Sequence, residues 1–126
     1  MTTLEYHGLN HASILVSNLS LSLNFYCDTL GMQLNSSRPN FNFKGAWLTI
    51  GNQEIHLLEL PNPDAGNLRP AHVGRDRHTA ISINSIDDAL RLLSEANISY
   101  TKSQSGRAAL FFRDPDDNGI EFVQVA

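Results

Sequence analysis

The 126-residue chain lacks several features that define particular protein classes. Its one cysteine, Cys27, excludes an internal disulfide framework, and we therefore expect a reducing compartment, the cytoplasm. No apolar run approaches the roughly 20 residues of a membrane-spanning helix, and the N-terminus MTTLEYHGLN has no signal-peptide pattern. Basic residues are also few: Lys and Arg number 9 against 13 Asp and Glu, for a net charge of −4. This balance argues against a nucleic-acid or membrane-surface partner.

The composition is otherwise that of an ordinary globular protein, with 41% hydrophobic and 17% charged residues. A chain of this length falls in the size range of a single domain and is long enough to bury a hydrophobic core. We therefore expect a single domain spanning residues 1–126.

The chain does contain an internal repeat. The segment HASILVSNLSLSLNFYCDTLG, beginning at His11, aligns without a gap with HTAISINSIDDALRLLSEANI, beginning at His78. Each copy has the pattern of a strand, a short polar turn and an amphipathic helix. The helices are predicted over residues 20–30, capped by Ser17 or Asn18, and 87–96, capped by Ser85 or Asp87.

Three further strands are predicted after each helix, and they complete the repeat. Their ranges are 32–38, 45–50 and 53–60 in the first copy, and 100–104, 108–113 and 120–125 in the second. Both copies therefore read β-α-β-β-β, with module 1 at about residues 8–60, a linker at 61–77 and module 2 at about 78–126. Neither module could bury its sheet face alone, so we expect an α+β fold in which the two modules pair.

The histidines that begin the two copies are predicted to face a cavity. Side chains alternate between the faces of a strand, so His11 shares its face with Ser13, and His78 shares its face with Ser82. The opposite faces of both strands are apolar and suit a packed helix. The faces with histidine and small residues are typical of a cavity lining.

The last strands of the two copies supply two more candidate ligands. The segments IHLL and IEFV align, which makes His56 and Glu121 equivalent positions. With His11 and His78 they give three imidazoles and one carboxylate, a set that suits Zn, Ni, Co, Mn or Fe. Such an ion would keep a net positive charge and act as a Lewis acid. The alternative, strongest for His56, is a histidine that only forms hydrogen bonds within a core.

At this point the chain resembles the vicinal oxygen chelate superfamily, also called the glyoxalase/bleomycin-resistance/dioxygenase fold. The resemblance covers residues 9–125 and rests on LNHASILVSN, SLNFYCDTLGMQL, RHTAISI and FFRDPDDNGIEFVQ. The last motif is the most specific, because the family typically reads Asp-Pro-Asp-Gly-Asn before a ligand Glu. Here Asp117 stands in place of the expected Gly, a change that affects the turn and leaves Glu121 in position.

The resemblance implies paired βαβββ modules that form an eight-stranded cup around one divalent metal ion. It assigns the ligands to His11, His56, His78 and Glu121, and it implies a small-molecule substrate and a homodimer. A site could be built from one chain or from two. In glyoxalase I the His56 position is usually Glu, whereas in extradiol dioxygenases and fosfomycin-resistance enzymes it is normally not a ligand. His56 therefore favours a four-ligand centre.

The leading functional hypothesis is a metal-dependent lyase or isomerase of the glyoxalase I (lactoylglutathione lyase) type. It would act on a substrate with vicinal oxygens through a metal-stabilised enediolate, with Glu121 as the candidate base. Arg107 and Trp47 are candidate substrate-binding residues, although a surface charge and a core aromatic are the commoner roles for these residue types. The alternatives are an Fe(II) extradiol-type dioxygenase, a thiol–epoxide transferase of the fosfomycin-resistance type and a bleomycin-resistance-like binding protein.

Overall fold

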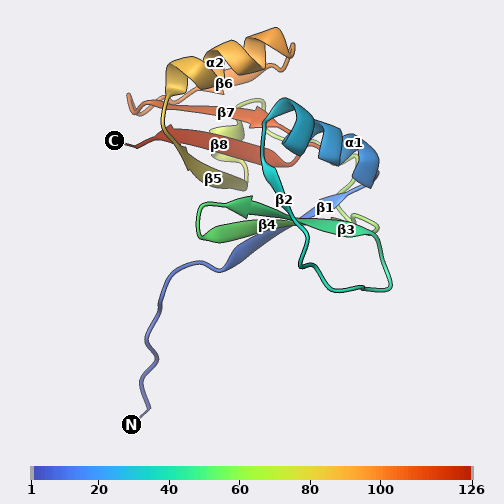
Figure 1. Ribbon diagram of the computed structural model, residues 1–126. Coiled ribbons are helices and arrows are strands. Elements are labelled where there is room, and N and C mark those ends of the chain that lie inside the picture. The colour runs from blue at the N-terminus through green and yellow to red at the C-terminus, as the bar shows by residue number, and fades with distance from the viewer. Residues whose placement is uncertain (1, 126) are drawn as a thin grey trace.

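The computed structural model describes residues 2–125, and eight strands within them form two four-stranded sheets (Figure 1). The first sheet has the order β1-β4-β3-β2 and the second has the order β5-β8-β7-β6. The strands of the first sheet are β1 (His11–Val16), β2 (Gln33–Asn35), β3 (Gly45–Ile50) and β4 (Gln53–Glu59). Those of the second are β5 (His78–Ile83), β6 (Tyr100–Lys102), β7 (Ala109–Arg113) and β8 (Gly119–Gln124). The predicted α+β fold of two βαβββ modules is confirmed. The last residue of the predicted second module, Ala126, lies outside the described residues.

Each sheet pairs its first strand with its last in parallel, and its other neighbouring strands are antiparallel. In the first sheet Ser13 lies opposite His56, and in the second Ala80 lies opposite Glu121. The register is therefore the same in both modules. It confirms that His56 and Glu121 occupy equivalent positions.

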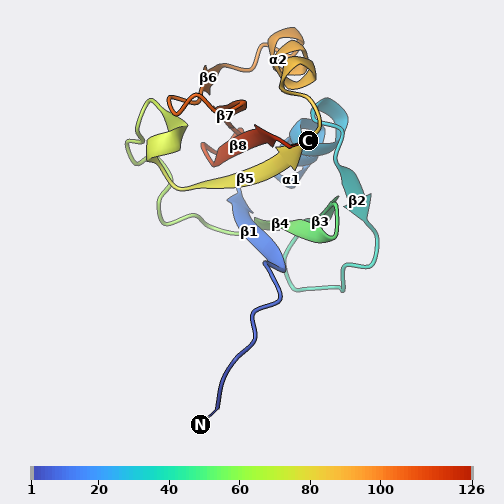
Figure 2. The same cartoon turned by 90° about the vertical axis from the view of Figure 1, so that its left-hand side faces the viewer.

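Two helices follow the first strands of the modules. Helix α2 (Ile86–Glu95) covers the outer side of the second sheet, as Figures 1 and 2 both show. Helix α1 (Leu19–Leu23) continues as a π-helical segment, η1 (Asn24–Thr29), so the predicted helix over 20–30 is present but only its first part is α-helical. In the wider turn, Leu30 N–H donates to the Phe25 carbonyl at 3.0 Å. No helix among residues 2–125 has both the length and the apolar character needed to cross a bilayer.

Repeat-equivalent side chains hold the helix N-termini in place. Asn18 and Ser85 are the caps, and each accepts a hydrogen bond from a backbone N–H in the first turn of its helix. Glu59 Oε2 accepts from Leu19 N–H at 2.8 Å, and Gln124 Oε1 accepts from Ile86 N–H, also at 2.8 Å. The last strand of each module thus fixes the start of its own helix.

The strands β2 and β6 are shorter than predicted because side chains redirect the backbone after them. Asn35 Oδ1 accepts from Ser37 N–H at 3.0 Å, and Ser103 Oγ accepts from Ser105 N–H at 3.2 Å. Such local bonds compete with the sheet ladder for backbone donors. They start the loop of residues 36–44 before β3 and the hairpin turn before β7.

The predicted apolar faces form one core shared by both modules. Its members include Ile14, Val16, Ile55 and Leu57 from the first sheet and Ile81, Leu110, Phe112, Ile120 and Phe122 from the second. The histidine-bearing faces are much more open, since His11, Ser13, His78, Ala80 and Ser82 are all exposed. The core thus joins the modules on one side and leaves His11 and His78 accessible, although Glu121, on the same face as His78, is buried.

A buried polar contact joins η1 of module 1 to the β7–β8 turn of module 2. Tyr26 donates its hydroxyl hydrogen to Asp114 Oδ2 at 2.6 Å, and both residues are buried. Asp114 also accepts from the side chain and backbone of Asn118 and from the backbone of Asp116. Burial raises the pKa of the Asp114 carboxyl, while the hydrogen bonds from Tyr26 and Asn118 oppose that rise. The turn itself contains Asp117 at φ 65°, where a glycine would be unstrained.

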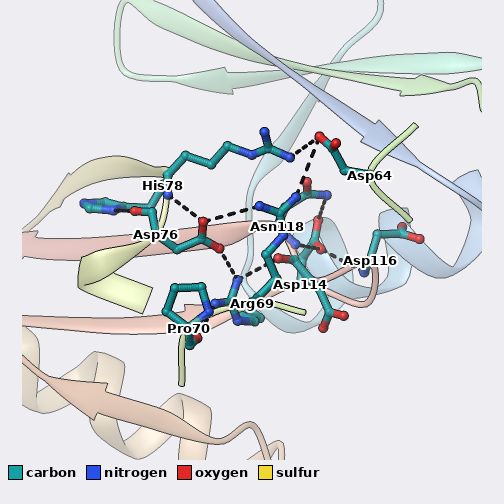
Figure 3. Close-up of polar contacts among 11 residues, drawn as sticks. Asp64, Arg69, Pro70, Asp76, His78, Asp114, Asp116 and Asn118 are labelled. Carbon is teal, nitrogen blue, oxygen red and sulfur yellow. Dashed lines mark hydrogen bonds and ion pairs between the residues drawn. The ribbon is translucent and has the colours of Figure 1, made fainter. Parts of the chain in front are cut away.

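A network of arginine–aspartate pairs ties the linker to the second sheet (Figure 3). Arg113, whose side chain is 18% exposed, donates to Asp76 Oδ2 at 3.0 Å and to the Pro70 and Asp117 carbonyls at 2.7 and 2.8 Å. Arg69 approaches the same Asp76 carboxylate at 3.5 Å. The linker includes a 3₁₀ turn, η2 (Val73–Arg75), directly before this carboxylate. The network therefore fixes the backbone immediately before His78.

The Tyr26–Asp114 contact leads to a pH-dependent prediction. The pKa of Asp114 is higher in the folded protein than in the unfolded chain, so its titration favours folding below the unfolded value of about 3.9. That contribution is lost as the pH rises through the folded value. Tyr26→Phe removes a donor to the ionised carboxylate and should lower the free energy of unfolding by about 1–3 kcal/mol at pH 7. The loss should shrink at pH 4, where Asp114 is more protonated.

Urea unfolding at both pH values measures this difference. Tyr100→Phe is the matched control, because Tyr100 is partly exposed and lies at the sheet edge. If Tyr26→Phe lowered the free energy of unfolding equally at pH 4 and pH 7, the hydrogen bond to ionised Asp114 would not be the cause.

The linker network leads to a second stability prediction. Arg113→Met keeps the aliphatic stem but leaves the Asp76 carboxylate and two carbonyls without this partner. We expect the free energy of unfolding to fall by about 2–4 kcal/mol. Arg91→Met is the control, because Arg91 and Asp88 form an exposed pair that should contribute under about 0.5 kcal/mol. Similar urea midpoints for the two variants would show that the network contributes no more than a surface pair.

Candidate metal centre

The first pair of predicted ligands forms a stack of aromatic rings on the first sheet. The His11 and His56 rings lie 3.9 Å apart, centroid to centroid, with an interplanar angle of 17°. On its other side His56 stacks on Trp47, at 4.3 Å and 7°. Trp47 and His56 are direct cross-strand partners on β3 and β4. The predicted substrate-binding residue Trp47 therefore contacts one of the predicted ligands.

His56 has a carboxylate partner, Glu54, that was not among the predicted site residues. Its Nε2 lies 2.9 Å from Glu54 Oε1, and Asn35 donates to the other oxygen of Glu54. The hydrogen bonds from His56 and Asn35 lower the pKa of Glu54. The available signal was the two-residue spacing of Glu54 and His56, which places both side chains on one face of β4. This bond satisfies His56 without a metal, so its role as a ligand stays a prediction.

The second pair of predicted ligands lies on β5 and β8. His78 Nε2 is 2.9 Å from Glu121 Oε1, and the Glu121 residue is only 3% exposed. Arg107 Nη2 donates to the other oxygen of Glu121 at 3.0 Å, while 58% of the Arg107 side chain remains exposed. The predicted substrate-binding arginine is thus in contact with the predicted base.

The hydrogen bonding of His78 fits a metal ligand. Its Nδ1 lies 2.8 Å from the Asp76 carbonyl oxygen, which can only accept, so Nδ1 carries a hydrogen. Nε2 then faces the Glu121 carboxylate either as the second N–H of an imidazolium or as a lone pair directed at a cation. Two ligand atoms about 2.1 Å from one ion at octahedral angles lie about 3 Å apart, close to the observed separation. Histidine ligands commonly have such a carbonyl partner on their other nitrogen.

The two pairs do not meet within one chain. Among residues 2–125, no three His, Cys, Asp or Glu side chains gather closely enough to surround one ion. The four predicted ligands therefore form two half-sites, His11 with His56 and His78 with Glu121. In Figure 2 the two sheets that carry them are separate layers.

Electrostatics differ between the half-sites. The His78 half-site contains the Glu121 carboxylate and the Arg107 guanidinium, and Asp76, which Figure 3 shows in its hydrogen-bond network, accepts from His78 through its carbonyl oxygen. The His56 half-site contains two imidazoles, Glu54 and an indole ring. Divalent cations favour imidazole and carboxylate donors, and both half-sites consist mainly of these groups.

Comparison with known proteins identifies relatives over nearly the whole chain. The model of the Glyoxalase/Bleomycin resistance protein/Dioxygenase superfamily matches residues 8–122. The protein Glyoxylase I 4 of Arabidopsis thaliana is 32% identical over 94% of this chain and 71% of its own length. The metallothiol transferase FosB of Staphylococcus epidermidis is 30% identical over 94% of this chain and 82% of its own.

Solved structures share the fold at lower sequence identity. A glyoxalase family protein from Bacillus anthracis superposes with a TM-score of 0.75 at 24% identity, covering 99% of this chain and 100% of that one. The fosfomycin resistance protein FosX from Listeria monocytogenes, solved with Mn(II) and a dihydroxypropylphosphonic acid, gives 0.74 at 17% identity, covering 97% and 95%. The family match over residues 8–122 and the 32% identity to Glyoxylase I 4 show that the chain belongs to the Glyoxalase/Bleomycin resistance protein/Dioxygenase superfamily.

Proposed function

We propose that this protein is a metal-dependent lyase or isomerase of the glyoxalase type. Its substrate would be a small molecule with oxygens on adjacent carbons. The observation that carries the proposal is the second half-site, in which His78 Nε2 and a buried carboxylate converge at 2.9 Å while His78 Nδ1 is committed to a carbonyl. Two relatives support the metal dependence, since FosX was solved with Mn(II) and FosB is named a metallothiol transferase. The name of Glyoxylase I 4 supports the glyoxalase type.

The proposed centre is completed by a second copy of the chain. One protomer supplies His11 and His56, and its partner supplies an equivalent of the His78–Glu121 pair. The separation of the half-sites within one chain and the exposure of His11 and His78 support this arrangement. A two-fold dimer would then contain two complete sites, because each chain contributes one half to each.

The residues around Glu121 suit proton transfer between adjacent carbons. The bound divalent ion would supply Lewis acidity that stabilises an enediolate-like oxyanion. Glu121 Oε1, once it loosens from the ion, would accept the proton from the substrate carbon and return it to the neighbouring carbon. Arg107 holds Oε2 at 3.0 Å, which leaves Oε1 as the oxygen that faces His78 and the substrate. Trp47 presents a flat apolar wall beside His56 and excludes water from that side.

A thiol–epoxide transferase is the second candidate function. The 30% identity to FosB over most of both chains favours it. The two candidates differ in what Glu121 does, because addition of a thiol to an epoxide requires no proton removal from carbon. Exchange of a substrate C–H for deuterium in D₂O would therefore support the lyase or isomerase, and its absence together with thiol consumption would support the transferase.

Metal content is the first direct test. Protein purified without chelator and reconstituted with Zn, Ni, Co, Mn or Fe salts should bind about one divalent ion per chain. His78→Ala should weaken metal binding at least about 100-fold, and His56→Ala should weaken it about 10-fold or more if His56 is a ligand. Plasma emission spectrometry and chelator competition measure both values. His7→Ala is the control, because His7 is exposed and lies outside both half-sites. Absence of any bound metal after reconstitution would refute the proposal.

Mixed dimers test whether two chains share one centre. The double variants His11→Ala/His56→Ala and His78→Ala/Glu121→Gln should each bind no metal. Co-refolded in equal amounts, they should recover about a quarter of the wild-type sites, because half of the dimers are mixed and each mixed dimer has one intact site of two. If all ligands came from a single chain, the mixture would recover no metal binding. That outcome would overturn the two-chain arrangement and leave the proposed metal dependence untouched.

A further inference from the structure

A small aromatic cavity lies directly beside His56. It has a volume of about 110 Å³, and its walls include Arg38, Phe41, Phe43, Trp47 and His56. The first three of these residues come from the loop of residues 36–44 between β2 and β3 (Figure 1). A liquid water occupies about 30 Å³, so the cavity accepts a group of several non-hydrogen atoms.

The cavity contains the guanidinium of Arg38, which has no acidic partner within residues 2–125. Arg38 lies over the Phe41 ring at 4.8 Å and near the Phe43 ring at 5.4 Å, and it donates Nη2 to the Phe43 carbonyl at 3.1 Å. No carboxylate oxygen among residues 2–125 comes within 4.0 Å of it. By contrast, five of the other arginines are paired with aspartate or glutamate: Arg69, Arg77, Arg91, Arg107 and Arg113.

The position of this guanidinium depends on a glycine in the sheet. A Cβ on Gly45 would lie 2.8 Å from Arg38 Nη2 and 2.5 Å from the Leu57 carbonyl oxygen. Gly45 thus leaves the space into which the half-buried guanidinium fits, and a solvated surface arginine would need no such space. Arg38 is held by two rings, one carbonyl and this gap, with most of its N–H groups left for a ligand.

We infer that this cavity is a substrate subsite that binds a carboxylate attached to a planar, unsaturated or aromatic group. The Arg38 fork matches a carboxylate bidentately, and Phe41 and Trp47 offer flat apolar surfaces to the planar part. The inference rests on the proposed function for its link to a substrate, since His56 borders both the cavity and the proposed centre. It assigns the charge and shape of one end of that substrate.

The single tryptophan of the chain reports on this cavity directly, because Trp47 forms one of its walls. Benzoate serves as the probe, and benzyl alcohol is its uncharged counterpart. In metal-free protein, benzoate should change Trp47 fluorescence saturably and bind about 10-fold or more tightly than benzyl alcohol. Arg38→Met should remove this preference, with benzoate affinity falling about 10-fold or more. The control Arg91→Met should leave both the preference and the benzoate affinity unchanged.

Two further variants separate charge from shape. Arg38→Lys keeps the charge but not the planar fork, and it should give an intermediate affinity. Phe41→Leu should weaken benzoate binding while leaving the weaker binding of acetate unchanged. Unchanged benzoate affinity in Arg38→Met, or equal binding of benzoate and benzyl alcohol by the wild type, would overturn the inference.

Metal content distinguishes this inference from the proposed function. Arg38→Met should bind as much metal as the wild type, because Arg38 is not a ligand. Benzoate binding that appears only after metal loading and is insensitive to Arg38→Met would overturn the subsite and leave the metal centre standing. Benzoate binding that depends on Arg38 in a protein that binds no metal would leave the subsite standing and refute the proposed function.

Discussion

The parallel pairing of the first and last strands of each module is the constraint on which the rest of the structure depends. It places His11 beside His56 and His78 beside Glu121, although the members of each pair are far apart in the sequence. A parallel pair cannot be closed by a tight turn, so the helix and the two intervening strands must form the crossover. Each half-site is therefore a direct product of module topology. The same register also sets Glu59 and Gln124 against the two helix N-termini.

The connection between modules determines how these half-sites are presented. The shared core, the Tyr26–Asp114 bond and the arginine–aspartate network fix one module against the other. The core and the Tyr26–Asp114 bond lie away from the histidine-bearing faces, whereas Arg113 lies on the same face of the second sheet as Glu121. His11 and His78 themselves remain exposed. The shared core thus lies on the opposite side of the strands from the candidate ligands, while the arginine–aspartate network borders the His78 half-site through Asp76. This arrangement leaves the ligand faces available to a second protein surface.

Much of the fold could be predicted from the sequence because its signals are local or repeated. The alternation along the strands and the alignment of IHLL with IEFV identified the packed faces and the equivalence of His56 and Glu121. The π-helical turn was not predictable, since it depends on tertiary contacts of Phe25 and Tyr26 with the second module. Pairing of the modules was expected, but the separation of the half-sites arises from three-dimensional packing that no local pattern encodes. The same holds for Arg38, whose position requires the gap at Gly45 across the sheet.

The strand order has a consequence for the behaviour of the chain in solution. In both sheets the long edge strand is the one that bears a candidate ligand, β1 or β5, with six residues each, whereas the opposite edges β2 and β6 have three. Unpaired edge strands expose backbone donors and acceptors that can template the addition of another strand. The two strands whose edges are most prone to aggregation, β1 and β5, are therefore the strands that carry His11 and His78. A substitution that leaves β1 or β5 exposed for longer during folding should therefore increase aggregation and lower the yield of folded protein.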